Sequence, residues 1–194
     1  MTGTQPQDRR AKRQRVARKP AAAAERMLER VALGCRAERS VAGALERLLR
    51  ARPYFHLLHS VPLDRGDIDH IVVGPTGVFV IETKGYRGLV RVTDAGLTVN
   101  GLCPDRDPLR QTRRGAAYVR SRLRRNGLVI PWVQAVLCLP YAELERPQCV
   151  GGILVTRREH LGYFIRHWHG RPLRDADASR VFALLQHCAE ASAA

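Results

Sequence analysis

The sequence predicts an α/β domain in which a mixed central β-sheet is flanked by α-helices. Three observations support this fold class: strand-like apolar runs cluster in the middle of the chain, helical apolar periodicity flanks them, and a long helical segment separates the first strands from two later ones. A β-meander followed by a helical crossover into further strands gives both antiparallel and parallel neighbours. The 194 residues suffice for one such domain.

The first 20 residues are a basic, low-complexity segment with seven Lys or Arg side chains and one acidic residue, Asp8. Because like charges repel and little apolar surface is available for burial, we predict a disordered tail over residues 1–20 and a folded domain over residues 21–194. Such a tail could bind nucleic acid loosely by neutralising phosphates, serve as a solubilising leader, or act as an organelle transit peptide. The sequence alone leaves these roles open.

A helix and three strands are predicted in the first half of the domain. The helical pattern starts at Ala21, allows a break at Gly34 and ends before Pro53; its apolar stripe consists of Val41, Ala44, Leu45, Leu48 and Leu49. Strand-like runs follow at residues 54–61, 68–73 and 78–81. The last two are joined by Gly74-Pro75-Thr76-Gly77, whose residue types suit a tight turn, so we expect these strands to be neighbours.

A hairpin, a long helix, two strands and two helices are predicted to follow. The hairpin pairs residues 89–93 with residues 97–100 around Asp94-Ala95-Gly96. The long helix begins at the N-cap Asp107, has Pro108 in its first turn and ends at Asn126-Gly127. The remaining elements are strands at 133–139 and 150–155, a helix from a capping box at Thr156-x-x-Glu159 to about Trp168, and a helix at about 175–189.

The charge balance is strongly basic, which points to polyanionic partners. Lys and Arg number 33 against 18 Asp and Glu, a net charge of +15, so nucleic acid is the first expected partner and an anionic membrane surface the second. No apolar run is long enough to cross a bilayer. The five cysteines are scattered without a C-x-x-C pair, which argues against a disulfide framework or a zinc ribbon and favours a reducing, cytoplasmic location.

Three charged residues stand at the ends of the two central strands. Asp69 lies near the start of one predicted strand, and Glu82 and Lys84 follow the apolar run 78–81 of the next. A carboxylate and an ammonium group at the end of an apolar strand are costly unless they are exposed, paired or bound to a metal. Since the tight turn makes these strands neighbours, Asp69 and Glu82 can converge on one point with Lys84 nearby.

This set of residues suits the hydrolysis of phosphodiester bonds. Two carboxylates can bind Mg²⁺, or Mn²⁺ in its place, and the ion would activate water and neutralise phosphate charge. Lys84 would orient the water or stabilise the developing negative charge. The alternative is a surface ion pair without catalytic function, because D-x-D and E-x-K patterns are frequent in charged chains.

The run from Gly66 to Lys84, GDIDHIVVGPTGVFVIETK, resembles the signature of the nuclease-related domain (NERD) family. The similarity extends over about residues 36–155 and includes Asp107-Pro108-Leu109-Arg110-Gln111 at the start of the long helix. This resemblance implies a restriction-endonuclease-like core of the PD-(D/E)xK superfamily. It also implies a metal-dependent nuclease, with DNA as the expected substrate.

Four residues take catalytic roles by this resemblance. Asp69 and Glu82 match the two metal ligands, Lys84 matches the catalytic lysine, and Glu38 on the first helix matches a glutamate that often completes such sites. The chain departs from the family pattern in two places: alanine precedes Glu38 where glycine is expected, and glycine follows Lys84 where asparagine is expected. Glu38 could equally be a charge on the helix surface.

Five further residues are candidates for contact with nucleic acid: Gln111, Arg110, Arg114, Tyr86 and Arg87. Gln111 matches a helix glutamine that touches the site or the DNA backbone, although a polar residue in a first helical turn looks the same. The helix arginines could line a phosphate track or form a solvated face, and Tyr86 and Arg87 could stack on a base or cap the pocket. A catalytically inert nucleic-acid-binding module and a protein-interaction domain are the alternatives to an enzyme. The sequence does not decide whether the protein forms a homodimer.

Overall fold

The chain consists of two compact units, Met1–Arg36 and Ala37–Ala194. The computed structural model describes residues 6–50, 52–63, 66–130, 132–170 and 172–191, with side chains from Ala23 onward. Helix α1 (Pro6–Arg50) is continuous through Gly34, so the break allowed for at that glycine does not occur. The helix includes most of the segment for which the sequence predicts disorder, and the division into a tail over residues 1–20 and a domain over residues 21–194 stays a prediction.

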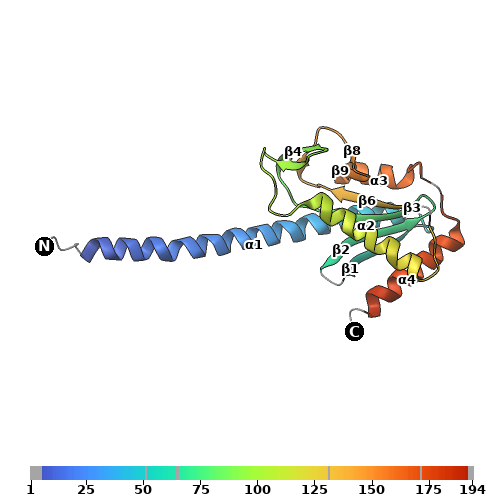
Figure 1. Ribbon diagram of the computed structural model, residues 1–194, viewed down its shortest axis with the longest axis horizontal. Helices are drawn as coiled ribbons and strands as arrows, with labels where there is room; N and C mark the ends of the chain where they lie inside the picture. The colour runs from blue at the N-terminus through green and yellow to red at the C-terminus, as the bar shows by residue number, and fades with distance from the viewer. Residues whose placement is uncertain (1–5, 51, 64–65, 131, 171, 192–194) are drawn as a thin grey trace. The chain divides into compact units, whose positions relative to one another are not determined.

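The second unit is built around a six-stranded sheet in the order β1-β2-β3-β6-β9-β8 (Figure 1). Its strands are β1 (His56–Pro62), β2 (Asp67–Gly74), β3 (Gly77–Thr83), β6 (Val133–Cys138), β8 (Gln148–Val150) and β9 (Ile153–Thr156). The β1–β2, β2–β3 and β8–β9 pairs are antiparallel, whereas β3–β6 and β6–β9 are parallel. The predicted mixed sheet is therefore confirmed, and its first parallel pair follows from the helical crossover between β3 and β6.

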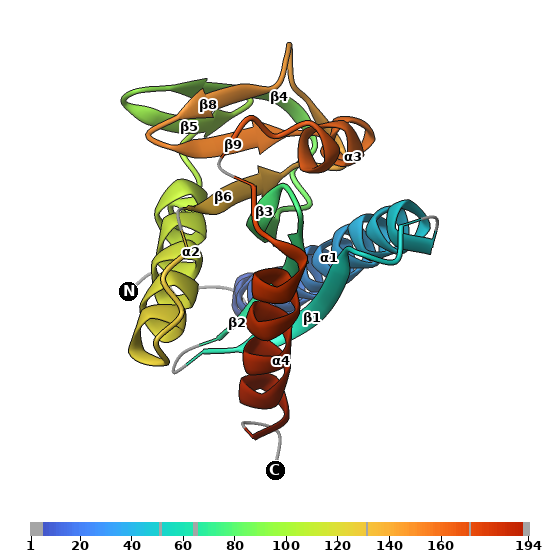
Figure 2. The same cartoon turned by 90° about the vertical axis from the view of Figure 1, so that its right-hand side faces the viewer.

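Helices cover both faces of this sheet (Figure 2). On one face, apolar side chains of α2 (Pro108–Arg125) and α4 (Asp175–Ala191) share a core with β2, β3 and β6. On the other face, α3 (Arg158–Arg166) and the C-terminal part of α1 pack together, with Val41, Leu45, Leu161 and Ile165 buried between helices and sheet. This is the predicted α/β architecture, consistent with a restriction-endonuclease-like core. Among the described residues, none of the helices combines the length and apolar character that a bilayer crossing requires.

A second, three-stranded sheet has the order β5-β4-β7. Its strands are β4 (Gly88–Thr93), β5 (Gly96–Val99) and β7 (Ala142–Glu143). The antiparallel β4–β5 pair is the hairpin that the sequence predicts. The two-residue β7 has no counterpart among the predicted elements, because so short a strand leaves no periodic pattern and exists only through its parallel pairing with β4.

The predicted ends of α2 are correct. Oδ1 of the N-cap Asp107 accepts hydrogen bonds from the backbone N–H groups of Leu109 and Arg110. At the other end, Gly127 has a φ of 73°, the left-handed conformation in which glycine commonly terminates a helix. Because Gln111 is in the first turn of α2, this N-terminal cap also sets the position of a predicted site residue.

The region around β9 differs from the prediction in two respects. The single strand predicted at 150–155 is the β8–β9 hairpin, because Gly151 and Gly152 both have positive φ (54° and 78°) and form a tight turn. The predicted capping box at Thr156 is also wrong. Arg157 is the N-cap of α3 and makes no side-chain capping hydrogen bond, and the Thr156 hydroxyl donates instead to the carbonyl oxygen of Arg157.

Gly74 lies against the buried ring of Phe55, where a side chain has no space. A Cβ atom at residue 74 would overlap the ring and come within 2.9 Å of its Cγ. We expect Gly74→Ala to lower the free energy of unfolding, measured by urea denaturation, by about 1–3 kcal/mol, the usual cost of overpacking. Gly34→Ala is the control: a Cβ there meets nothing within 4 Å, and alanine favours helix, so stability should be unchanged or raised. Equal stability of the two variants would contradict the tight contact at Phe55.

Candidate active site

The β2–β3 hairpin brings Asp69 and Glu82 to adjoining strand ends. In this hairpin His70 pairs with Ile81, so one further step of the same register places Asp69 opposite Glu82. Glu82 is only 5% exposed because it continues the fully buried strand β3. Lys84 follows, and its backbone N–H donates to the carbonyl oxygen at the end of β6 (3.0 Å). The three charged residues therefore lie at one end of the central strands.

Short hydrogen bonds fix both carboxylates. The backbone N–H of Thr83 donates to Oδ2 of Asp69 at 2.6 Å. Oε1 of Glu82 accepts two hydrogen bonds, from Nζ of Lys84 and from Nε2 of Gln111, each at 2.6 Å. Oδ1 of Asp69 and Oε2 of Glu82 accept no hydrogen bond from the part of the chain that the structure describes. Each acid thus keeps one oxygen for a ligand.

Both acids have raised pKa values, and burial is the largest cause in each case. Burial, followed by the charge of Glu82, raises the pKa of Asp69 to about 7, although the Thr83 N–H acts in the opposite direction. Burial also raises the pKa of Glu82, which the adjacent Lys84 ammonium opposes. Because the charge of Glu82 disfavours ionisation of the half-buried Asp69, a bound divalent cation would stabilise the ionised forms of both acids.

Two more acidic residues, Glu38 and Asp67, lie around this pair. Glu38 is at the surface of α1; its partial burial, then the charge of Asp67, raises its pKa, while Lys84 lowers it. The charges of Glu38 and Asp67 also contribute to the raised pKa of Glu82. Asp67 is therefore part of the acidic group although no role is predicted for it. Its D-x-D spacing with Asp69 is the signal in the sequence that points to it.

Of the residues predicted to contact nucleic acid, Gln111 and Tyr86 lie close to the acidic residues, and the three arginines are exposed. Gln111 reaches the site directly through its hydrogen bond to Glu82. Tyr86 is half-buried, and burial, followed by the charge of Glu82, raises the pKa of its hydroxyl, which places it near the same carboxylate. Arg87 is exposed in the segment after Tyr86, and Arg110 and Arg114 are exposed on α2.

The two central carboxylates are the available donors for a metal ion. Within the described ranges, no group of three or more His, Cys, Asp or Glu side chains is arranged to hold one. His70, beside Asp69 in the chain, is engaged elsewhere: its Nδ1 lies 2.8 Å from Nδ1 of His59, and burial, then His59, lowers its pKa to about 4. Two carboxylates with open oxygens fit Mg²⁺ or Mn²⁺, which can take their other ligands from water and substrate phosphate.

Comparisons with known proteins give a family match and a short match to a curated protein. A family model described as "Nuclease-related domain" (NERD) matches residues 33–140, more than half of the chain. An uncharacterised protein of Bacillus anthracis is 46% identical over 41 residues, which are 19% of this chain and 19% of that protein. The match therefore covers less than two thirds of that curated relative. No solved structure matches the chain.

Proposed function

The chain belongs to the nuclease-related domain family, and we propose that it is a metal-dependent phosphodiesterase that hydrolyses nucleic acid, with DNA as its substrate. The observation that carries this proposal is the placement of Asp69, Glu82 and Lys84 at adjoining strand ends, with an open oxygen on each acid. A surface ion pair would leave Glu82 in water, whereas its side chain is almost fully buried. Clustered acids with perturbed pKa values are typical of functional sites.

Each residue has a separate role in the proposed reaction. Asp69 and Glu82 hold Mg²⁺ or Mn²⁺, which when bound activates water and neutralises charge on the phosphate. Lys84 orients the water or stabilises negative charge on the phosphate, and its side chain is 26% exposed. Gln111 fixes the orientation of Glu82, and Glu38 completes the acidic group from α1.

Basic side chains near the site are proposed to bind the DNA backbone. Arg110 and Arg114 are exposed on α2, the helix whose first turn also carries Gln111 to Glu82. Arg87 is exposed on the segment that follows Lys84, and the neighbouring Tyr86 offers a ring for stacking on a base. With a net charge of +15, we expect the affinity for DNA to fall steeply with salt.

Cleavage of plasmid DNA tests the proposal. The native protein is expected to convert supercoiled plasmid into nicked or linear forms in the presence of Mg²⁺ or Mn²⁺, and to be inactive in EDTA. Cleavage that persists in EDTA would exclude the metal-dependent reaction. A protein that binds the plasmid but leaves it supercoiled with both ions would refute the nuclease assignment.

A binding module without catalysis is the second candidate, and the ion pair between Lys84 and Glu82 favours it. Their charged atoms are 2.6 Å apart, so the ammonium group already neutralises one of the acids that a metal would need. This candidate predicts DNA binding that weakens with salt, persists in Asp69→Asn and Glu82→Gln variants, and leads to no cleavage with any metal.

Gln111→Ala is expected to lower the single-turnover cleavage rate at saturating DNA by about tenfold. The substitution removes the amide that holds Oε1 of Glu82, and partners that orient metal ligands typically contribute about 10–100-fold. Arg110→Ala, in the same helical turn, is the matched control: it should weaken DNA binding and reduce its salt dependence while leaving the saturated rate near native. An unchanged rate in Gln111→Ala would show that its hydrogen bond to Glu82 has no part in the reaction.

A further inference from the structure

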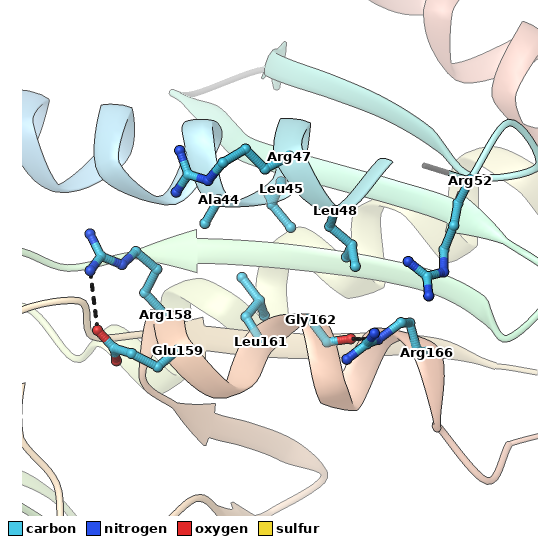
Figure 3. A pocket seen from close by; sticks show the side chains of 10 residues that line it. All are labelled: Ala44, Leu45, Arg47, Leu48, Arg52, Arg158, Glu159, Leu161, Gly162 and Arg166. Atoms are coloured by element: carbon cyan, nitrogen blue, oxygen red, sulfur yellow. Dashed lines mark hydrogen bonds and ion pairs between the residues drawn. The ribbon is translucent and has the colours of Figure 1, made fainter. Parts of the chain in front are cut away.

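A cavity of about 420 Å³ lies between α1 and α3 and shares no lining residue with the acidic site (Figure 3). Its floor is apolar: Leu48 of α1 is half-buried and reaches the pocket, and Leu45 of α1 and Leu161 of α3 are buried beneath it. Gly162 lies beside Leu48: a Cβ there would be in ordinary van der Waals contact with Leu48 Cδ1 at 3.5 Å, so a side chain at residue 162 would cover this part of the floor. The volume is in the range of pockets that hold small organic groups.

Four arginines surround this apolar floor. Figure 3 shows Arg47 and Arg158 at one end of the pocket and Arg52 and Arg166 at the other. One acidic residue, Glu159, is also in the lining, so four guanidinium groups face a single carboxylate and three positive charges are uncompensated. Guanidinium groups bind phosphate through paired, charge-assisted hydrogen bonds. The charge of the lining therefore favours an anionic ligand.

Part of this basic lining is held in place and part is available. Arg158 donates to Ser40 Oγ and to Glu159, and Nε of Arg166 donates to the carbonyl oxygen of its own helix at residue 162 (2.9 Å). The side chains of Arg47 and Arg52 make no hydrogen bond or ion pair with any residue that the structure describes. Each end of the pocket thus has one hydrogen-bonded arginine, Arg158 or Arg166, and one arginine that could bind a ligand, Arg47 or Arg52.

We propose that this pocket binds an unpaired segment of a nucleic-acid strand, with phosphates at the two arginine ends and a base against Leu48 between them. Arg158 and Arg166 are eight residues apart on α3, which separates the two ends by about 12 Å along the helix at 1.5 Å per residue. Basic ends with an apolar surface between them match a strand in which charged phosphates alternate with bases that have apolar faces.

Helix α1 connects the pocket to the acidic site. Glu38 belongs to that site, and Ala44, the first residue of the pocket lining, follows six residues later, about 9 Å along the helix. Ser40, between them, binds Arg158. A strand that leaves the carboxylates along α1 would therefore reach the pocket, and this continuity favours a nucleic-acid strand over a free anion. The identity of the ligand in this inference rests on the proposed function.

Fluorescence anisotropy with a labelled single-stranded DNA oligonucleotide in EDTA tests the pocket without cleavage. The double variant Arg52→Gln/Arg166→Gln removes one arginine side chain that makes no hydrogen bond with the described residues and one that is hydrogen-bonded. The control Arg91→Gln/Arg180→Gln removes the same charge from exposed positions on β4 and α4. We expect the pocket variant to bind about tenfold more weakly than this control, as for the loss of charge-assisted hydrogen bonds. Gly162→Leu, which fills the floor without changing charge, should also weaken binding, and its helical position tolerates leucine.

The outcomes separate this inference from the nuclease proposal. If the arginine variant binds the oligonucleotide as tightly as its charge-matched control and Gly162→Leu binds it as tightly as the native protein, the pocket assignment is overturned, whether or not the native protein cleaves DNA. If the native protein does not cleave DNA with Mg²⁺ but the pocket variants lose affinity, the pocket stands and the nuclease proposal fails. If a nucleoside monophosphate binds the native protein as tightly as the oligonucleotide and displaces it, the strand assignment is overturned in favour of a free nucleotide.

Discussion

Glu82→Gln is expected to lower the rate of metal-dependent DNA cleavage by about a hundredfold to a thousandfold, the loss typical when one preorganised charged group is removed from a reaction site. The amide keeps the size of the side chain, and its oxygen can still accept the hydrogen bonds from Lys84 and Gln111. The fold should therefore persist while the negative charge that would hold the metal is lost. Cleavage assays across a range of Mg²⁺ concentrations, with circular dichroism as the test of folding, measure both effects.

The matched control for this substitution is Glu143→Gln. Glu143 is exposed on β7, and its charge is not among those that shift the pKa values of Asp69 and Glu82, so the same chemical change there should leave cleavage at the native rate. A folded Glu82→Gln variant that cleaves DNA as fast as the control would remove Glu82 from the catalytic assignment. An equal loss of cleavage rate in both variants would mean that the net charge of the protein, and not the acidic site, determines the rate.

Mg²⁺ is expected to raise the melting temperature of the native protein but not that of Asp69→Asn. An ion that binds the folded state stabilises it by about 2.7 kcal/mol at a hundredfold excess over its dissociation constant, which corresponds to a rise of roughly 5–10 °C for a domain of this size. The asparagine can still accept the hydrogen bond from the Thr83 N–H, so the loop geometry is kept while a charged oxygen ligand is lost. Differential scanning calorimetry with Mg²⁺ and with EDTA measures the shift.

Asp67→Asn is the control that distinguishes binding of Mg²⁺ by Asp69 and Glu82 from nonspecific attraction of Mg²⁺ to acidic side chains. Asp67 is exposed and two residues from Asp69, so its substitution removes the same charge from the same strand. We expect this variant to keep most of the Mg²⁺-dependent rise. An identical rise in the native protein and Asp69→Asn would show that the ion binds somewhere other than the predicted ligand.

Much of the fold was predictable because its signals are local. The turn from Gly74 to Gly77 and the capped ends of α2 depend on residue types within a few positions, and both are found where the sequence predicts them. The elements that differ depend on context. Gly34 does not interrupt α1, and Gly151-Gly152, a dipeptide that suits a two-residue hairpin turn, divides the predicted strand 150–155 into the β8–β9 hairpin.

The part of the candidate site that could be predicted is the part that strand geometry determines. Alternation along β2 and β3, with a tight turn between them, is enough to bring Asp69 and Glu82 together. The hydrogen bond from Gln111 to Glu82 depends on how α2 docks against the sheet, and no periodicity in the sequence contains that information. The sequence therefore suggests Gln111 as a contact but does not indicate which carboxylate it would hold.

The arginine pocket has no signature in the sequence at all. Arg52 and Arg166 are far apart in the chain, and only the packing of α1 and α3 on one face of the sheet puts them at one end of the same cavity. In a chain with 33 basic residues, neither stands out from the others. Surface sites assembled from distant basic residues become visible only once the helices are placed.

Anomalous diffraction from crystals of the protein soaked with Mn²⁺ tests the central claim most directly. The predicted result is one strong peak coordinated by a carboxylate oxygen of Asp69 and one of Glu82, with the Lys84 ammonium group beside it. A map in which those two oxygens hold no ion, while manganese occupies other acidic positions or none, would contradict the proposed metal centre.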